Sequence, residues 1–315
     1  MLERKPAVTP HSAFRTRRSF SVQVPATSAN LGPGFDALGM ALGLWNTVHI
    51  EPCECLEIQI AGEGAGEVSA GPENLVYRAL ARVSERLGAS PPPVRLRCEN
   101  TIPLARGLGS SSAAIVAGLL AGNRLHGDSL DTAQLLELAV EIEGHPDNVT
   151  PALLGGLRVC VAGEQGPVQT AVKPARPLQA VLFVPDFPMP TAAARELLPT
   201  RVPMADAIYN LGRVALLVAA LASGEYGLLR EATRDRLHQP ARTSLLPAMS
   251  AFFAAALEAG ALGAFLSGAG STLLALVEDR GEPVASAFEA VARREGMAGR
   301  ALVVPAAVEG ARVLA

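Results

Sequence analysis

The sequence predicts an α+β protein built from two domains. Strand-like and helix-like segments mix along the chain without the regular alternation that is typical of a doubly wound sheet. The composition shifts to Gly, Pro and polar residues over 163–177, which favours a domain boundary there. The chain has 315 residues and is 49% hydrophobic, enough for two ordinary cores. We predict domains at 19–168 and 169–315, preceded by a loose basic leader at 1–18.

In the first part of the chain, alternating segments predict strands and segments of helical period predict helices. The predicted strands are 20–26, 45–52, 56–64, 94–99 and 156–163. The predicted helices are 74–87, 111–124, 131–143 and 149–155. Asp131 is expected to cap the third of these helices. The motif TSANLGPGFD and the link GHPDN are expected to be loops.

The second part predicts a buried strand at 179–185 and a strand, glycine turn and strand over 264–278. A last strand is predicted at 301–304. The predicted helices are 191–198, 204–221, 226–233, 247–258 and 282–295. The most apolar run, 211–224, contains Arg213 and is typical of a buried helix, so we expect no membrane span.

Charge and cysteine usage narrow the class of protein. The formal net charge of −3 and the lack of a long basic face argue against a nucleic-acid partner. The first residues have no apolar core of signal-peptide type, which predicts a cytoplasmic protein. The four cysteines fall on strands or strand ends and are expected to be buried or half-buried free thiols: Cys53, Cys55, Cys98 and Cys160. Cys53-x-Cys55 lacks both zinc-ribbon spacing and a second pair, so no metal site is expected there.

The segment PLARGLGSSSAA at 103–114 is the strongest local signal. Its glycines permit a tight turn and close approach of a ligand, and its serines precede an apolar helical run. A helix N-terminus with free N–H groups favours an anion, usually phosphate. A flexible turn before a core helix is the alternative. The residues of this predicted phosphate site are Pro103, Leu104, Ala105, Arg106, Gly107, Leu108, Gly109, Ser110, Ser111, Ser112 and Ala113.

The scarcity of lysine excludes two common designs of kinase active site. Only Lys5 and Lys173 are present, one in the leader and the other in a Pro-rich stretch. A Walker A loop needs Gly-Lys-Ser/Thr, and a protein kinase needs a strand lysine over the phosphates. A nucleotide site in this chain must therefore rely on backbone amides, hydroxyls and a cation.

Three segments occur together: VPATSANLGPGFDALGMAL at 24–42, the glycine-rich loop, and LSGAGST at 266–272. In this order they resemble the GHMP kinases, which phosphorylate small metabolites with ATP. PATSANLGPGFDALG, EGHPDNV and TAAAREL are similar to motifs of the homoserine kinases. The resemblance covers nearly the whole chain after the leader. It implies an N-terminal domain like that of ribosomal protein S5, a ferredoxin-like C-terminal domain, and the use of ATP and Mg²⁺.

The resemblance also implies the metal ligands. Ser111 begins one helix and Glu143 ends another, where its carboxylate opposes the helix dipole unless a cation is near. The family comparison implies this pair as the Mg²⁺ ligands. Ser112 replaces the alanine common in relatives, so either serine hydroxyl remains open as the ligand. Glu141 remains the alternative carboxylate.

The other implied site residues flank short motifs. Those matching the family's substrate positions are Asn30, Asp36, His145, Thr191, Arg195 and Arg242. Guanidinium groups suit the substrate carboxylate, and an amide with a carboxylate suits an amino group and a hydroxyl. Asp36, Asp147 and Asn148 are the candidates for the catalytic step. The competing roles are local turn capping for Asn30 and Asp36, surface solvation for the arginines, and helix capping for Asp147.

The expected activity is transfer of phosphate from ATP to the hydroxyl of L-homoserine, a step of threonine biosynthesis. Three alternatives are weighed against it. One is a GHMP kinase for mevalonate or a sugar, and another is a catalytically silent ligand-binding relative. A serine hydrolase is disfavoured because the serine cluster has no G-x-S-x-G elbow. The sequence leaves the oligomeric state open, including a homodimer.

Overall fold

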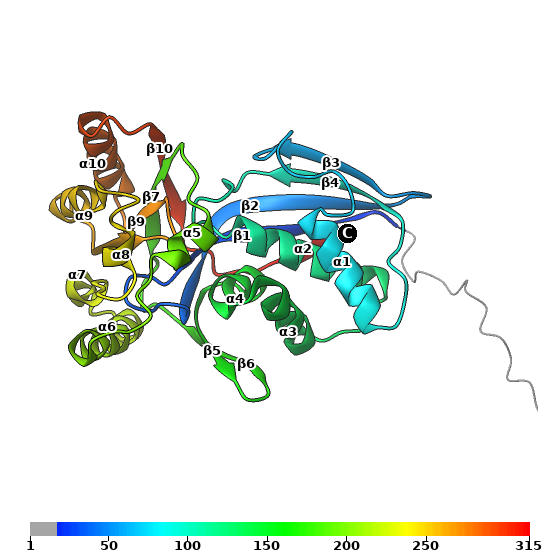
Figure 1. Cartoon of the computed structure of the whole chain (residues 1–315), viewed down its shortest axis with the longest axis horizontal. Helices are drawn as coiled ribbons and strands as arrows, with labels where there is room; N and C mark the ends of the chain where they lie inside the picture. The colour runs from blue at the N-terminus through cyan, green and yellow to red at the C-terminus, as the bar shows by residue number, and fades with distance from the viewer. Residues whose placement is uncertain (1–17) are drawn as a thin grey trace, which may run out of the picture.

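The computed structural model describes residues 18–315 as two β-sheets joined side by side, with helices packed on both (Figure 1). The predicted leader lies outside the described residues except for Arg18, which is exposed. The predicted α+β class is therefore confirmed.

The first sheet is built around a strand of 15 residues, β2. Its N-terminal end pairs with β5 and its C-terminal end with β4, while β1 runs antiparallel along most of its length. β3 lies parallel to β4, β6 extends the sheet from β5, and β11 pairs with β1. The strands are β1 Phe20–Ala29, β2 Leu38–Pro52, β3 Glu57–Gly62, β4 Val94–Asn100, β5 Leu157–Gly163, β6 Gly166–Val172 and β11 Arg312–Leu314.

Four helices pack beneath this sheet and bury its apolar side chains (Figure 1). They are α1 Leu75–Arg86, α2 Ser110–Leu125, α3 Thr132–Glu143 and α4 Pro146–Leu154. Asp131 caps α3 as predicted, with a reciprocal bond from its own backbone N–H to the Gln134 side chain. This capping box fixes the start of α3. The helix ends at Glu143, with Gly144 as its C-cap.

The second sheet is antiparallel, in the order β10-β7-β9-β8. Along β7, Ala180 and Leu182 join the core shared with the first sheet, whereas Val181 and Phe183 pack under α9 and α10. Such alternation is what a strand covered on both faces requires. The strands are β7 Gln179–Pro185, β8 Gly263–Leu266, β9 Leu273–Val277 and β10 Gly299–Pro305. The helical segments are α5 Thr191–Glu196, α6 Met204–Ser223, η1 Tyr226–Leu228, α7 Leu229–Ala232, α8 Gln239–Arg242, α9 Met249–Glu258 and α10 Gly281–Arg294.

Backbone hydrogen bonds join three loops where the two sheets meet. The Thr27 amide of β1 donates to the Leu108 carbonyl at 3.0 Å, and the Thr272 amide donates to the Arg106 carbonyl at 3.1 Å. The Gly268 amide donates to the Ala29 carbonyl at 3.1 Å. The loop before α2, the end of β1 and the turn between β8 and β9 are therefore held against one another, and these contacts position the site.

Several expectations about individual elements were wrong. The supposed linker at 163–177 contains strand β6, and the predicted boundary at 168/169 falls inside it. β2 begins at Leu38, before the predicted 45, and the predicted helix over 226–233 is split into η1 and α7. The short elements α8 and β11 carry too few residues for a detectable period and were not predicted. β11 also places the end of the chain in the first sheet.

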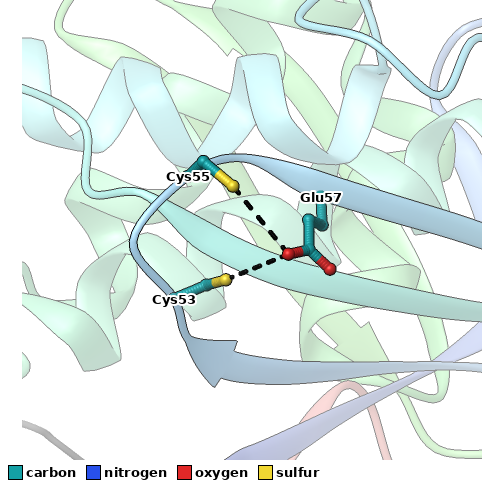
Figure 2. Close-up of side chains that lie close together, drawn as sticks. All are labelled: Cys53, Cys55 and Glu57. Carbon is teal, nitrogen blue, oxygen red and sulfur yellow. Dashed lines mark hydrogen bonds between the residues drawn. The ribbon is translucent and has the colours of Figure 1, made fainter.

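One of the four thiols is more exposed than predicted. Cys98 and Cys160 are buried and Cys53 is half-buried, but Cys55 is exposed at the turn between β2 and β3 (Figure 2). All four are free, as expected.

Helix α6 differs from the buried helix predicted at 211–224. It is the one helix of the described chain that is long and apolar enough, by length and composition alone, to cross a membrane. Only 22% of its most apolar window is buried within the protein, including Leu217 and Leu221. Asn210 bonds to the Pro33 carbonyl at 3.1 Å, and Arg213 forms an ion pair with Glu231, so polar contacts also tie the helix to the protein.

We expect Gly118→Ala to destabilise the protein by about 1–3 kcal/mol, because overpacking forces α1 and α2 apart. A Cβ at Gly118 in α2 would lie 2.1 Å from the Val76 carbonyl oxygen of α1. Gly212→Ala in α6 is the matched control, since nothing lies within 4 Å of its added Cβ. The control should gain up to about 1 kcal/mol from helix propensity. Urea unfolding of both variants measures the difference, and equal stabilities would contradict the close packing of α1 on α2.

Candidate active site

The loops at the junction of the two sheets surround a cavity of about 230 Å³. It contains the predicted metal, substrate and catalytic side chains from both parts of the chain. The predicted residues that line it are Asn30, Asp36, Ala105, Arg106, Gly107, Gly109, Ser110, Ser111, Glu143, His145, Asp147, Asn148, Thr191, Arg195 and Arg242. Five predicted ATP-binding residues do not line it: Pro103, Leu104, Leu108, Ser112 and Ala113.

The glycine-rich loop ends in the N-terminus of α2. Gly109 occupies the N-cap position with φ 68°, a left-handed conformation that favours glycine. A Cβ there would lie 2.0 Å from the Thr27 hydroxyl oxygen. Because the N-cap has no side chain, the first N–H groups of α2 lack a side-chain cap and are available to an anion.

Two serine hydroxyls meet one carboxylate beside this helix end. Ser111 Oγ and Ser112 Oγ each lie 2.8 Å from Oε1 of Glu143. Ser111 lines the cavity, whereas Ser112 is fully buried behind it. The alternative carboxylate, Glu141, forms an ion pair with Arg82 at 3.2 Å on the outer side of α3. The geometry therefore favours Ser111 and Glu143 over the two alternatives.

Asp36 and Arg195 form a two-bond ion pair in the cavity wall. The guanidinium donates to the two carboxylate oxygens at 2.7 and 3.0 Å. Both side chains are about one-third exposed, at 35% for Asp36 and 36% for Arg195. Arg195 lies in α5, whose first residue, Thr191, also lines the cavity. The pair is thus accessible, and a charged ligand can exchange with either partner.

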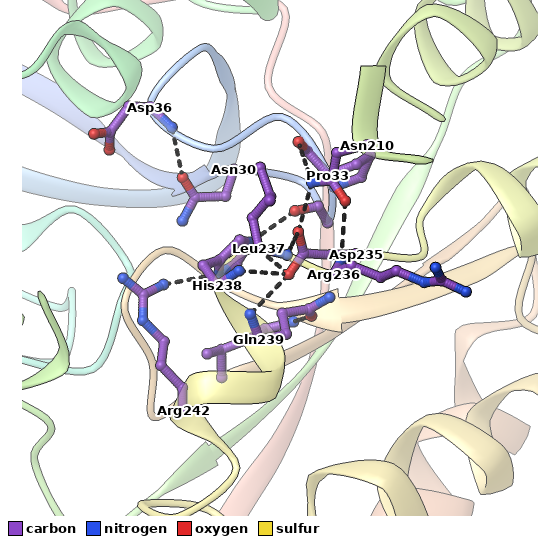
Figure 3. Close-up of polar contacts among 12 residues, drawn as sticks. Asn30, Pro33, Asp36, Asn210, Asp235, Arg236, Leu237, His238, Gln239 and Arg242 are labelled. Carbon is purple, nitrogen blue, oxygen red and sulfur yellow. Dashed lines mark hydrogen bonds and ion pairs between the residues drawn. The ribbon is translucent and has the colours of Figure 1, made fainter. Parts of the chain in front are cut away.

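Arg242 is a buried cation at the cavity wall, with only 2% of the residue exposed. Its Nη1 donates to His238 Nδ1 at 2.8 Å (Figure 3). The same Nη1 donates to the Gly268 carbonyl at 3.1 Å. Among the residues the structure describes, no carboxylate forms an ion pair with it. Burial, with the charge of Arg195, lowers its pKa to about 10, so it remains charged at neutral pH. A buried cation without a protein counter-ion is suited to bind an anionic ligand.

The side chain of Asn30 ties the turn that carries Asp36 to the turn between β8 and β9. Its Oδ1 accepts from the Asp36 amide at 3.0 Å (Figure 3). Its Nδ2 donates to the Gly268 carbonyl at 2.9 Å. The local capping role considered for Asn30 is therefore present, while the residue also lines the cavity.

His145, Asp147 and Asn148 form a third wall. His145 Nδ1 lies 2.6 Å from Asp147 Oδ1, and the Thr27 hydroxyl donates to Asn148 Oδ1 at 2.8 Å. Burial alone would lower the pKa of His145, but the bond to Asp147 and the charges of Asp147 and Glu143 outweigh it and raise that pKa. Asp147 makes no side-chain cap for α4, contrary to the capping alternative, and pairs with His145 instead.

A second cavity, of about 220 Å³, was not predicted from the sequence. It adjoins the first, because Ala105, Ser110 and Ser111 line both. Its other walls are mainly apolar, with the amide side chains of Asn46, Asn74 and Asn100. These residues come from separate strands and a helix cap, so no continuous motif announces the cavity.

Models of the GHMP kinases match both parts of the chain: the N-terminal domain at 74–156 and the C-terminal domain at 217–294. The chain is 45% identical to a homoserine kinase of Desulfitobacterium hafniense, over 93% of this chain and 99% of that protein. It is 46% identical to one of Synechococcus, over 93% and 97% of the two chains. The crystal structure of homoserine kinase from Cytophaga hutchinsonii superposes with a TM-score of 0.86 at 29% identity, covering 96% of this chain and all of that one (100%). This likeness along the whole length means that the chain belongs to the homoserine kinase family of the GHMP kinases.

Proposed function

We propose that the protein transfers the γ-phosphoryl group of ATP to the side-chain hydroxyl of L-homoserine and so forms O-phospho-L-homoserine for threonine biosynthesis. The relatives named homoserine kinase support this activity. The observation that carries it in the structure is Arg242, a buried cation without a protein carboxylate in the wall of a cavity large enough for an amino acid. The α-carboxylate of homoserine supplies the missing charge.

The ion pair of Asp36 and Arg195 provides for the rest of the amino acid. A bound zwitterion replaces this one pair with two: its carboxylate binds Arg195 and Arg242, and its ammonium group binds Asp36. His145 and Thr191 close the same cavity around the hydroxyl-bearing carbon. Bidentate arginine contacts fix orientation, which is the main requirement of phosphoryl transfer.

The nucleotide lies across the two adjoining cavities in this proposal. The adenine occupies the mainly apolar second cavity, where Nδ2 of Asn46 and Oδ1 of Asn100 can bond to the edge of the base. Asn74 also lines this cavity, but its side chain caps α1 and bonds to the Ser69 carbonyl. The triphosphate follows the 103–113 loop to the N-terminus of α2, where free N–H groups and the helix dipole favour negative charge. Ser110 and Ser111 line both cavities, so the terminal phosphate lies next to the substrate.

Ser111 and Glu143 are suited to hold Mg²⁺. A hydroxyl and a carboxylate are hard oxygen ligands, and one or two such protein ligands together with phosphate and water are typical of Mg²⁺ sites. Their 2.8 Å contact shows that both groups already converge beside the phosphate loop. The ion would neutralise charge on the β- and γ-phosphates.

No strong base is required, because the transition state of phosphoryl transfer is loose. Asp147 is the better placed acceptor for the hydroxyl proton, since it lines the cavity and shares a hydrogen bond with His145. Asp36 is paired with Arg195 in the free protein and with the ammonium group of the substrate in the proposed complex. Asn148 bonds to Thr27 and Asp147 and keeps that carboxylate in place.

The proposal extends to a cytoplasmic homodimer. Free thiols are typical of a reducing compartment. Met204, Ile208 and Leu211 are exposed at 75%, 61% and 71% and share one face of α6, which gives a second copy an apolar surface to pack against.

The activity is tested by ADP release from Mg-ATP with a panel of homoserine, mevalonate, serine and galactose. We expect release that depends on homoserine and is far weaker with the other three compounds. Serine lacks one methylene of homoserine, and so its hydroxyl falls short of the phosphate. Absence of homoserine-dependent release would overturn the proposal, and release with mevalonate or galactose instead would assign another GHMP activity.

The metal ligands are tested by Glu143→Gln. We expect activity at limiting Mg²⁺ to fall at least about 100-fold and to recover in part at high Mg²⁺, because a charged ligand of the ion has been removed. Glu141→Gln is the control, since Glu141 is two positions away and bonds to Arg82. Full activity of Glu143→Gln at limiting Mg²⁺ would contradict the assignment.

A further inference from the structure

A buried polar network lies behind the cavity wall, in the segment that joins α7 to α8 (Figure 3). Its anchor is Asp235, whose side chain has 0% exposure. One carboxylate oxygen accepts from the Asn210 side chain at 2.7 Å and the Leu237 amide at 2.9 Å. The other accepts from the amides of His238 and Gln239 at 2.9 and 2.7 Å. Four hydrogen bonds to one carboxylate hold the segment rigidly.

The imidazole of His238 joins two halves of the substrate site. Its Nε2 lies 2.7 Å from the Gly32 carbonyl oxygen, in the turn that carries Asp36. Its Nδ1 lies 2.8 Å from Nη1 of Arg242. A carbonyl can only accept and a guanidinium can only donate. Both contacts form together only when the ring is neutral, with its proton on Nε2.

We propose that His238, fixed as the neutral Nε2–H tautomer, is a positioning residue that sets the Arg242 guanidinium relative to the Asp36 turn. The proposal rests on the homoserine kinase activity above. His238 is fully buried and does not line the cavity, so it acts through Arg242 and Gly32. The Gly268 carbonyl links Arg242 to Asn30 a second time, because it accepts a hydrogen bond from each of them.

Protonation of His238 would break this arrangement. The ring would then present an N–H to the guanidinium, and two cations would face each other in a buried place. The charged groups around the ring are Asp235, Arg242 and Asp36, and the Phe35 ring packs on it at 5.3 Å. Burial, assisted by Arg242 and opposed by Asp235, lowers the pKa of His238 and keeps the ring neutral.

Two substitutions separate the contacts. His238→Asn keeps a side-chain acceptor near the Nδ1 position, and His238→Gln keeps a donor near the Nε2 position. We expect His238→Gln to raise KM for homoserine about 10- to 100-fold, as a misplaced positioning group does, while KM for ATP is unchanged. His238→Asn should retain more of the homoserine affinity. Arg236→Gln is the control, because this neighbouring side chain is exposed and bonds to Asp206.

The pH dependence distinguishes positioning from a merely structural role. Wild-type KM for homoserine should rise as pH falls well below about 6.5, the ordinary histidine pKa. This rise should be shallower in His238→Asn, which cannot titrate there. Heteronuclear NMR of the wild-type imidazole should show the Nε2–H tautomer at neutral pH, which tests the proposal even if a variant does not fold. An Nδ1–H tautomer, or equal losses for homoserine and ATP, would overturn the proposal. If the wild type showed no homoserine-dependent activity, the proposed homoserine kinase function would be overturned instead.

A separate cluster lies at the turn between β2 and β3 (Figure 2). The sulfur atoms of Cys53 and Cys55 lie 3.3 and 3.8 Å from the same Glu57 oxygen, Oε1. The three ligand atoms lie within 4.8 Å of one another. Arg95 binds the other oxygen of Glu57 at 2.7 Å and so keeps Oε1 directed at the thiols.

We propose that these three residues form a surface site for a thiophilic divalent cation such as Zn²⁺. The sequence spacing argued against a metal site because it showed only one cysteine pair. The structure adds a third ligand, and two thiolates with a carboxylate suit Zn²⁺, with water as a fourth ligand. Each thiol releases its proton to solvent on binding.

Titration of the reduced, metal-free chain with Cd²⁺ tests this site through the sulfur-to-metal charge-transfer absorbance. We expect saturation at one ion per chain, loss of the band in Cys53→Ser and Cys55→Ser, and at least about tenfold weaker binding in Glu57→Gln. Glu54→Gln in the same turn is the control and should bind as the wild type does. A band that fails to saturate, or that persists in the double serine variant, would overturn the site.

Discussion

The active site depends on the contact between the loop before α2 and the turn between β8 and β9. Gly107 lies at its centre, where a Cβ would approach the Ser267 carbonyl oxygen to 2.1 Å, and the Ser267 hydroxyl donates to the Gly107 carbonyl at 2.6 Å. The same hydroxyl lies 2.8 Å from that of Ser28 in β1. Three chain segments distant in sequence therefore meet at one buried hydroxyl. If these segments separated, the glycine-rich loop and the two arginines would no longer line one cavity.

Charge is distributed unevenly across this contact. The first domain contributes mainly acids, Asp36, Glu143 and Asp147, and the second contributes Arg195 and Arg242. These two arginines come from helices α5 and α8, which are only six and four residues long. Helices this short are not stable alone, so tertiary contacts must hold them. The bonds from Asp235 and His238 give α8 that support.

Local patterns in the sequence predicted most of the fold, whereas the resemblance to the homoserine kinases implied most of the residues that meet in the cavity. Asp131 signalled a helix start through one capping box, and PLARGLGSSSAA signalled a turn before a helix. What it missed depends on partners far along the chain. β6 and β11 exist because β5 and β1 offer them an edge, and the second cavity assembles Asn46, Asn74 and Asn100 from separate elements. His238 gave no signal either, since a single buried histidine is indistinguishable from core filling until its neighbours are known.

The pairing of β11 with β1 has a consequence for how the protein is made. Arg312 to Leu314 pair with Ser21 to Gln23, so the first and last strands of the described chain are neighbours in one sheet. During synthesis β1 is made long before β11, so this edge of β1 stays uncovered while β2 to β9 are being added. A chain that has not yet added β11 therefore exposes a strand edge that the folded protein covers.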